Sequence, residues 1–196
     1  MDIQTFMLTD YQSNCYVVTS NGQSLIIDPG APDQRILDAV ADTAVIAIVN
    51  THAHPDHIGG SPQLKKELGV PLLLHKADRA WWRTLLGDEV PPDRYLDEGE
   101  TINLGSLSLE VMHMPGHCPG QVILLEHSQR FIFSGDLIFA GSIGRTDFPG
   151  GSDEQMRDSL QRLDKLEGNW TIYPGHGPAT TLDQERTTNP FLVKLR

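Results

Sequence analysis

The chain has 196 residues, of which 39% are hydrophobic and 21% charged, which is typical of one folded globular domain. Its formal net charge of −11 disfavours nucleic acid and anionic membranes as partners, since both require clustered lysine and arginine. Two cysteines, Cys15 and Cys118, are too few for a disulfide framework and favour a reducing compartment. The amino terminus carries no secretory pattern, and no apolar run reaches the ~20 residues of a membrane helix. We therefore expect one cytoplasmic domain over residues 1–196.

Hydrophobic periodicity and turn residues predict a mixture of strands and helices along the chain. Strands are expected, in chain order, at residues 3–8, 15–19, 24–27, 45–49, 71–74, 107–112, 121–125, 130–133 and 170–173. Helices are expected at residues 33–41, at 153–166 and at 182–187. A further helix is expected to begin after an N-cap at Ser61, and a separate one, which contains Trp81 and Trp82, is expected to end at Gly87. Strands followed by helices in each half indicate two packed sheets with helices outside them.

A dense cluster of metal-binding residues directly follows the apolar strand at residues 45–49. His52, His54, Asp56 and His57 lie within six residues, and Gly59-Gly60 follows them. Imidazoles and carboxylates are the usual protein ligands of zinc and related divalent metals. Burying several of them without partners would cost roughly 2–7 kcal/mol each, so a hydrophobic core is a poor explanation for the cluster. Its place at the end of a buried strand predicts a metal site at a sheet edge.

Three later segments each place one further candidate ligand beside glycine at the end of a predicted strand. They are Pro115–Gly120 with His117, Phe133–Asp136 with Asp136, and Tyr173–Pro178 with His176. Seven candidates are too many for one tetrahedral ion. They suit two ions, one held by three histidines and the other by a second set, with one carboxylate bridging them.

The HxHxDHxGG run, the later GH, the SGD and the PGHG near the end resemble, in this order, the metallo-β-lactamase-fold hydrolases. The segment Gly141–Gly151 is similar to that of the short glyoxalase II-like branch, which is also called the hydroxyacylglutathione hydrolase type. The resemblance implies an α+β fold, an αβ/βα four-layer sandwich with two central mixed sheets and helices on the outer faces. It also implies a single domain without the carboxyl-terminal helical domain that longer members use to bind glutathione.

The resemblance divides the seven residues into two ligand sets. His52, His54 and His117 would hold the first metal, and Asp56, His57 and His176 the second. Asp136 would bridge the two ions, which are expected to be Zn²⁺, with iron or manganese also compatible with mixed nitrogen and oxygen ligands. Asp56 and Asp136 would then be the catalytic carboxylates, orienting a hydroxide between the metals.

The implied reaction is hydrolysis of a small-molecule thioester, with D-lactoylglutathione as the leading substrate. Two cations lower the pKa of bound water toward neutrality, and a leaving thiolate with a pKa near ~8.5 needs little help from an acid. Arg145 is the candidate for binding a substrate carboxylate, and the alternative is that it forms an ordinary structural salt bridge. Zinc β-lactamases usually carry cysteine where Asp136 stands, which disfavours antibiotic hydrolysis.

Other functions are also compatible with the sequence. A glutathione persulfide dioxygenase with mononuclear iron shares the first histidine cluster, and other esters or lactones are alternative substrates. A non-catalytic scaffold would be expected to have lost some of the ligands. The sequence carries no pattern that sets an oligomeric state.

Several polar and aromatic residues outside the ligand set also have expected roles. Asp28 and Asp147 are candidates for supporting the histidine ligands, with a simple turn as the alternative for Asp28. Trp81 and Trp82 are expected to be packing residues, with a place at the rim of a pocket as the alternative for Trp82, and Cys118 is expected to be a buried filler. The remaining histidines, His75, His113 and His127, are expected to lie outside the metal site.

Overall fold

The computed structural model describes residues 1–195 and contains two six-stranded sheets and a small two-stranded ribbon. The strands are β1 (Asp2–Leu8), β2 (Ser13–Ser20), β3 (Gln23–Ile27), β4 (Ala44–Val49), β5 (Leu72–His75), β6 (Arg94–Leu96), β7 (Thr101–Leu104), β8 (Leu107–His113), β9 (Val122–Glu126), β10 (Phe131–Gly135), β11 (Ile138–Phe139), β12 (Ser142–Ile143), β13 (Thr171–Pro174) and β14 (Thr180–Thr181). The helices are α1 (Gln34–Val40), α2 (Pro55–Ile58), α3 (Ser61–Leu68), the 3₁₀ turn Lys76–Asp78, α4 (Arg79–Leu86), α5 (Asp153–Asp164), α6 (Leu182–Thr188) and α7 (Pro190–Val193).

Each sheet is mixed, and each is built largely from one half of the chain. The first sheet has the order β1-β2-β3-β4-β5-β6, antiparallel up to β3 and parallel beyond it. The hairpin between β2 and β3 turns at Asn21 and Gly22, both with positive φ, as expected from an Asn-Gly pair. The second sheet has the order β14-β13-β10-β9-β8-β7, in which only β10 and β13 are parallel.

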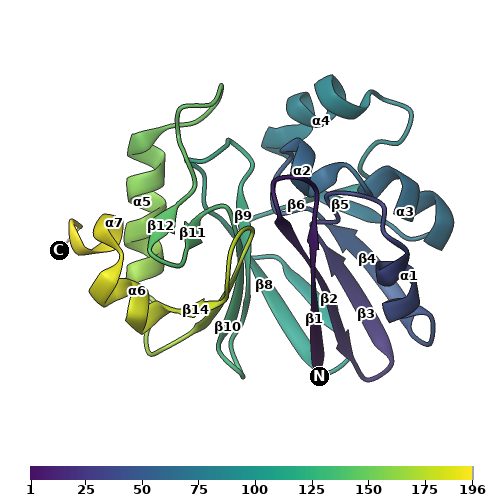
Figure 1. Ribbon diagram of the computed structural model, residues 1–196, viewed down its shortest axis with the longest axis horizontal. Coiled ribbons are helices and arrows are strands. Elements are labelled where there is room, and N and C mark those ends of the chain that lie inside the picture. Colours follow the sequence, from purple (N-terminus) through teal and green to yellow (C-terminus); the bar gives the residue numbers. More distant parts are fainter. Residues whose placement is uncertain (196) are drawn as a thin grey trace.

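Alternation along the strands divides the apolar residues between two kinds of core. On β2, Tyr16 and Val18 face the second sheet, whereas Cys15 and Val17 pack with the buried residues of α1 and α3. On β9, Leu124 faces the first sheet, and its neighbours belong to the cluster that contains α5, α6 and α7. Figure 1 shows the result: α1 and α3 on one outer side, α5 to α7 on the other, and both sheets between them. The predicted αβ/βα sandwich is confirmed.

The structure differs from the sequence prediction mainly in its shortest elements. The strands β6, β7, β11, β12 and β14 and the helices α2 and α7 were not expected, because two to four residues are too few to show a period. Ser61 is the first helical residue of α3 and not its N-cap, which is Gly60. Within residues 1–195, no helix is long and apolar enough to span a membrane.

Four segments that carry the predicted ligands meet at one end of the sandwich. They are the segment after β4, which includes α2, the connection between β8 and β9, the end of β10 and the end of β13. The main chains of β2 and of the segment after β13 are joined there by a hydrogen bond from Asn14 N to Gly175 O of 2.7 Å. The fold therefore brings residues from both sheets to a single site.

Candidate metal centre

The cluster after β4 is shaped by a short helix and a buried asparagine. Pro55 begins α2, which places Asp56 and His57 on its first turn directly after the extended residue His54. Asn50 Nδ2 donates to His57 O at 2.9 Å, and Ser61 Oγ donates to Asn50 Oδ1 at 2.9 Å. These bonds close the segment into a compact loop and fix the four candidate ligands relative to one another.

The three later candidates arrive from the other sheet. His117 lies between β8 and β9, Asp136 directly follows β10, and His176 lies two residues after β13. Gly175 is required for the close approach of these segments, because a Cβ there would lie 2.1 Å from Asp136 Oδ1 and 2.9 Å from His57 Cε1. The glycine beside the ligand in the PGHG motif thus makes room for the neighbouring ligands.

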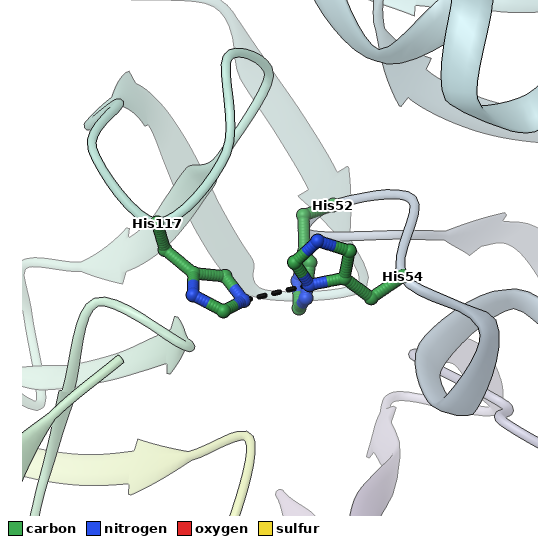
Figure 2. A group of neighbouring side chains, drawn as sticks. All are labelled: His52, His54 and His117. Atoms are coloured by element: carbon green, nitrogen blue, oxygen red, sulfur yellow. Dashed lines mark hydrogen bonds between the residues drawn. The ribbon is translucent and has the colours of Figure 1, made fainter. Parts of the chain in front are cut away.

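The first predicted set converges on one point. One ligand atom from each of His52, His54 and His117 lies within 4.8 Å of the others, and all three residues are buried. Figure 2 shows the three rings directed toward one another, with His117 Nε2 2.7 Å from His54 Nδ1. Three imidazoles this close are a suitable nitrogen triad for a divalent metal.

The second predicted set, Asp56, His57 and His176, also satisfies this spacing. Asp56 Oδ2 lies 3.2 Å from His176 Nε2 and 3.6 Å from His57 Nε2, and the two imidazole nitrogens are 3.2 Å apart. His57 is fully buried, but Asp56 and His176 are partly exposed. This set is therefore the more accessible of the two.

Asp136 lies between the two sets. Its Oδ2 is 3.4 Å from His117 Nε2 of the first set and 3.6 Å from His176 Nε2 of the second. Its Oδ1 is 3.4 Å from His57 Nε2. This position is the one that a bridging carboxylate requires.

Outer partners orient four of the rings so that the other nitrogen faces the site. Three of these contacts are His57 Nδ1 to Asp28 Oδ2 at 3.1 Å, His117 Nδ1 to Arg145 O at 2.7 Å and His176 Nδ1 to Tyr11 O at 3.1 Å. The fourth is His52 Nδ1 to Thr51 Oγ1 at 3.1 Å. Such outer contacts fix the tautomer of a ligand histidine. Asp28 thus supports a ligand, one of its two expected roles.

The electrostatics of the two sets differ. Burial and the neighbouring His117 and His57 lower the pKa of His54 to about 3, and burial lowers the pKa of His52 well below its usual value. In the second set burial opposes the charged form of His57, yet Asp136 and Asp28 raise its pKa to about 9. His52 and His54 are therefore neutral imidazoles, the form that ligates metal.

The second set contains carboxylates that need a positive charge. Burial alone would raise the pKa of Asp56, but the hydrogen bond from His176 and the charge of His57 lower it to about 2. Burial likewise opposes the charged form of His176, whose pKa is nevertheless raised by the hydrogen bond to Asp56 and by Asp136. Protonated His57 supplies that charge here, at a position where a bound cation would supply it.

Three buried polar atoms identify what the site is suited to hold. Among residues 1–195, His52 Nε2, His54 Nε2 and Asp136 Oδ1 are the buried side-chain atoms without a hydrogen-bond partner. All three belong to the predicted ligands, and buried polar groups are otherwise almost always paired. The donor set, its spacing and these unpaired atoms fit a dinuclear divalent metal site.

Asp78 supports the first set and had no sequence signal. This fully buried carboxylate ends the 3₁₀ turn after β5 and accepts from Ala53 N at 2.8 Å and from Gly120 N at 2.6 Å. It thereby joins the loop of His52 and His54 to the loop of His117. Cys118 Sγ, buried as expected, also donates to Asp78 at 3.3 Å.

A cavity of about 630 Å³ opens over the metal ligands. Its aromatic wall includes Tyr11, Trp81 and Phe148. Trp82 is buried, as expected of a packing residue, but Trp81 borders the cavity, which was not expected, and meets the His54 ring edge-on with ring centres 5.7 Å apart. Helical spacing alone did not identify which of two adjacent residues faces inward.

Arg145 lines this cavity but is already paired. Its guanidinium makes two hydrogen bonds to Asp147, of 2.5 and 2.6 Å, and lies 4.1 Å from the centre of the Phe148 ring. Asp147 therefore contacts this arginine and not a histidine ligand, contrary to one expectation.

The three other histidines lie outside the centre, as expected. His75 and His113 stack on each other with ring centres 4.0 Å apart, and His127 pairs with Glu110 at 2.6 Å.

Comparison with known proteins places this geometry in a family. The model of the metallo-β-lactamase superfamily matches residues 8–176. Hydroxyacylglutathione hydrolase GloC of Haemophilus influenzae is 35% identical over 208 residues, which cover 98% of each chain.

Three solved structures resemble the fold closely. The BLEG-1 B3 metallo-β-lactamase has a TM-score of 0.87 at 31% identity and covers 97% of this chain and 99% of its own. TTHA1623 in a di-iron-bound form has a TM-score of 0.85 at 36% identity, with coverage of 96% and 100%. ETHE1 from Myxococcus xanthus has a TM-score of 0.83 at 26% identity, with coverage of 97% and 84%.

The chain belongs to the metallo-β-lactamase superfamily. Within it, the family match and the site geometry together define a metal-dependent hydrolase.

Proposed function

We propose that this protein hydrolyses thioesters of glutathione, with a hydroxyacylglutathione such as D-lactoylglutathione as its substrate. The observation that carries the reaction type is the position of Asp136 between two complete ligand sets. Support for the acyl-thiol substrate comes from the similarity to GloC across 98% of both chains. When bound, two divalent ions would lower the pKa of water toward neutrality and supply hydroxide near pH 7.

The protein's own groups would position the reactants. Asp56 and Asp136 would hold the water and orient its lone pair toward the substrate carbonyl, since each carboxylate contacts histidines around the centre. The aromatic wall of the cavity would shield the reacting carbonyl from bulk water, which strengthens electrostatic stabilisation of the developing charge. The leaving thiolate, with a pKa near ~8.5, requires no dedicated acid.

The proposed metals are two zinc ions. The first set offers only nitrogen, and the second adds carboxylate oxygen, a mixture that also accepts iron or manganese. The di-iron form of TTHA1623 makes iron the principal alternative. We further propose a cytoplasmic protein that acts on a small molecule, without nucleic acid or membrane partners, in keeping with its acidic charge and two free buried thiols.

A second function, oxidation of glutathione persulfide at a single iron, is favoured by the likeness to ETHE1 at 26% identity. The completeness of the second set favours hydrolysis, because one ion would leave Asp56, His57 and His176 without a shared ligand role. Esters, lactones and, given the likeness to BLEG-1, β-lactams are further carbonyl substrates to compare.

Steady-state hydrolysis of D-lactoylglutathione beside these other substrates, with metal content measured on the same sample, tests the proposal. We expect about two divalent metals per chain and the highest kcat/KM for the glutathione thioester. One iron per chain together with oxygen consumption on glutathione persulfide would overturn it in favour of the dioxygenase. A higher kcat/KM for a lactone or β-lactam would overturn the substrate assignment.

A further inference from the structure

A second cavity, of about 750 Å³, lies beside the metal cavity between α5, α7 and the segment after β12. Figure 1 shows α7 alongside α5 and the β11–β12 ribbon on the outer side of the second sheet. Apolar side chains of the lining include Met156, Leu160 and Phe191. The charged residues of the lining are Arg145, Asp147, Asp153, Arg157 and Lys194.

The unpaired charge of this second cavity is positive. Of its two carboxylates, Asp147 forms an ion pair with Arg145, whereas Asp153 keeps its charge and accepts a hydrogen bond from the neutral Thr146 Oγ1. Arg157 and Lys194 are exposed, and neither forms an ion pair with any residue in the range 1–195. With Arg157 and Lys194 set against Asp153, the described lining has a net charge of +1, which in a chain of net charge −11 is a local attraction for anions.

The second cavity and the metal cavity lie side by side and share part of their lining, which is called the partition below. Ile143, Gly144 and Arg145 line both. The partition packs directly against the predicted metal ligands. A Cβ at Gly144 would lie 2.0 Å from Asp136 O, and Arg145 O accepts a hydrogen bond from His117 Nδ1. One extended molecule can therefore lie across three consecutive residues and reach both cavities.

We infer that the second cavity binds the carboxylate-bearing end of the thiol half of the substrate, with Arg157 and Lys194 as its cationic partners, while the thioester lies over the metal ligands. This inference rests on the proposed thioester hydrolysis. A tripeptide thiol such as glutathione extends over roughly 10 Å, which suits a ligand that spans two adjoining cavities. Carboxylates are the groups that arginine and lysine bind, and the apolar lining would contact the methylene groups between them.

Binding of S-methylglutathione, whose blocked sulfur cannot act as a thiolate ligand, tests the anchor independently of turnover. We expect the double substitution R157E/K194E to weaken its calorimetric Kd about tenfold, and R157Q/K194Q to weaken it about threefold. K66E is the matched control, because Lys66 is an exposed lysine of α3 on the opposite sheet, and its Kd should equal that of the unaltered protein. An unchanged Kd in R157E/K194E would overturn the inference.

The kinetic arm compares D-lactoylglutathione with the lactoyl thioester of N-acetylcysteamine, which carries no carboxylate on its thiol half. We expect the ratio of the two KM values to rise about tenfold in R157E/K194E and to stay constant in K66E. Thioester hydrolysis with a constant ratio in R157E/K194E would sink the inference and leave the proposed function standing. The unaltered protein could hydrolyse neither thioester while R157E/K194E still bound S-methylglutathione more weakly than it does. That result would remove the proposed function and support only the binding of the carboxylate in the second cavity.

Discussion

The two ligand sets of the metal centre share a purpose but differ in their surroundings. The set of His52, His54 and His117 is buried and contains only nitrogen ligands, and the pKa values of His52 and His54 are lowered. The set of Asp56, His57 and His176 is partly exposed, contains a carboxylate and has raised histidine pKa values. His52 and His54 can thus bind a metal without losing a proton, whereas protons compete with a metal at the second set. Asp136 therefore lies between two groups of candidate ligands that differ in charge and exposure.

The largest effect is expected from removing the residue common to both sets. Asp136→Ala should abolish binding of both metals or reduce kcat/KM by more than about 100-fold, because the carboxylate contacts histidines of each set. Metal content and hydrolysis of D-lactoylglutathione measure this. Retention of two metals with full turnover would disprove the bridging role. An exposed carboxylate elsewhere, changed in Asp88→Ala, serves as the control and should alter neither quantity.

A smaller effect should distinguish the two sets through their supporting carboxylates. Asp28→Asn should weaken metal binding by the set of His57 about 10- to 100-fold and binding by the set of His52 less, because Asp28 accepts directly from His57 Nδ1 but reaches His52 only through Thr51 Oγ1. Asp78→Asn should instead weaken binding by the first set, since Asp78 joins the loops of His54 and His117. Competitive titration with a chelator resolves the two affinities. Equal loss at both sets in both variants would show that the sets are not independent.

The smallest effect concerns the metal-free protein and pH. His57, with its pKa raised to about 9, contributes stability that is present below its unfolded pKa of ~6.5 and is lost as pH rises through about 9. His54, with its pKa lowered to about 3, must instead be protonated on unfolding, so stability also falls as pH decreases from ~6.5 toward 3.

The free energy of unfolding of the metal-free protein should therefore be greatest near neutral pH. Its loss between pH 7 and 9.5 should be on the order of 2 kcal/mol. Urea unfolding across this range measures it, and the metal-loaded protein is the control, in which the alkaline loss should be much smaller. A metal-free protein that gains stability from pH 7 to 9.5 would contradict the assignment of charge to His57.

Most candidate ligands of the metal centre could be predicted because they occur in short sequence motifs. Four candidates stand in one short run, and glycine marks the segments of His117, Asp136 and His176. Asp78 could not be predicted, because its partners lie 25 and 42 residues away in sequence and nothing in its own surroundings marks it. The second cavity was missed for the same reason, since α5, α7 and the segment after β12 meet only in the folded chain.

The large layers followed from periodicity, but the small elements did not. The apolar strand β4 and the amphipathic α5 each bury a face long enough to recognise. By contrast, α2 has four residues and lies within the metal-binding run itself, where polar ligands replace the apolar pattern. The metal-binding residues therefore hide the helical pattern of α2. Which of Trp81 and Trp82 faces the cavity depends on how α4 packs in the folded chain.

Each ligand set draws two residues from the segment after β4 and one from the second sheet. Neither half of the chain therefore holds either of these two sets complete. An ion held by either set would therefore be bonded to residues of both sheets and would crosslink them, so metal binding should oppose their separation.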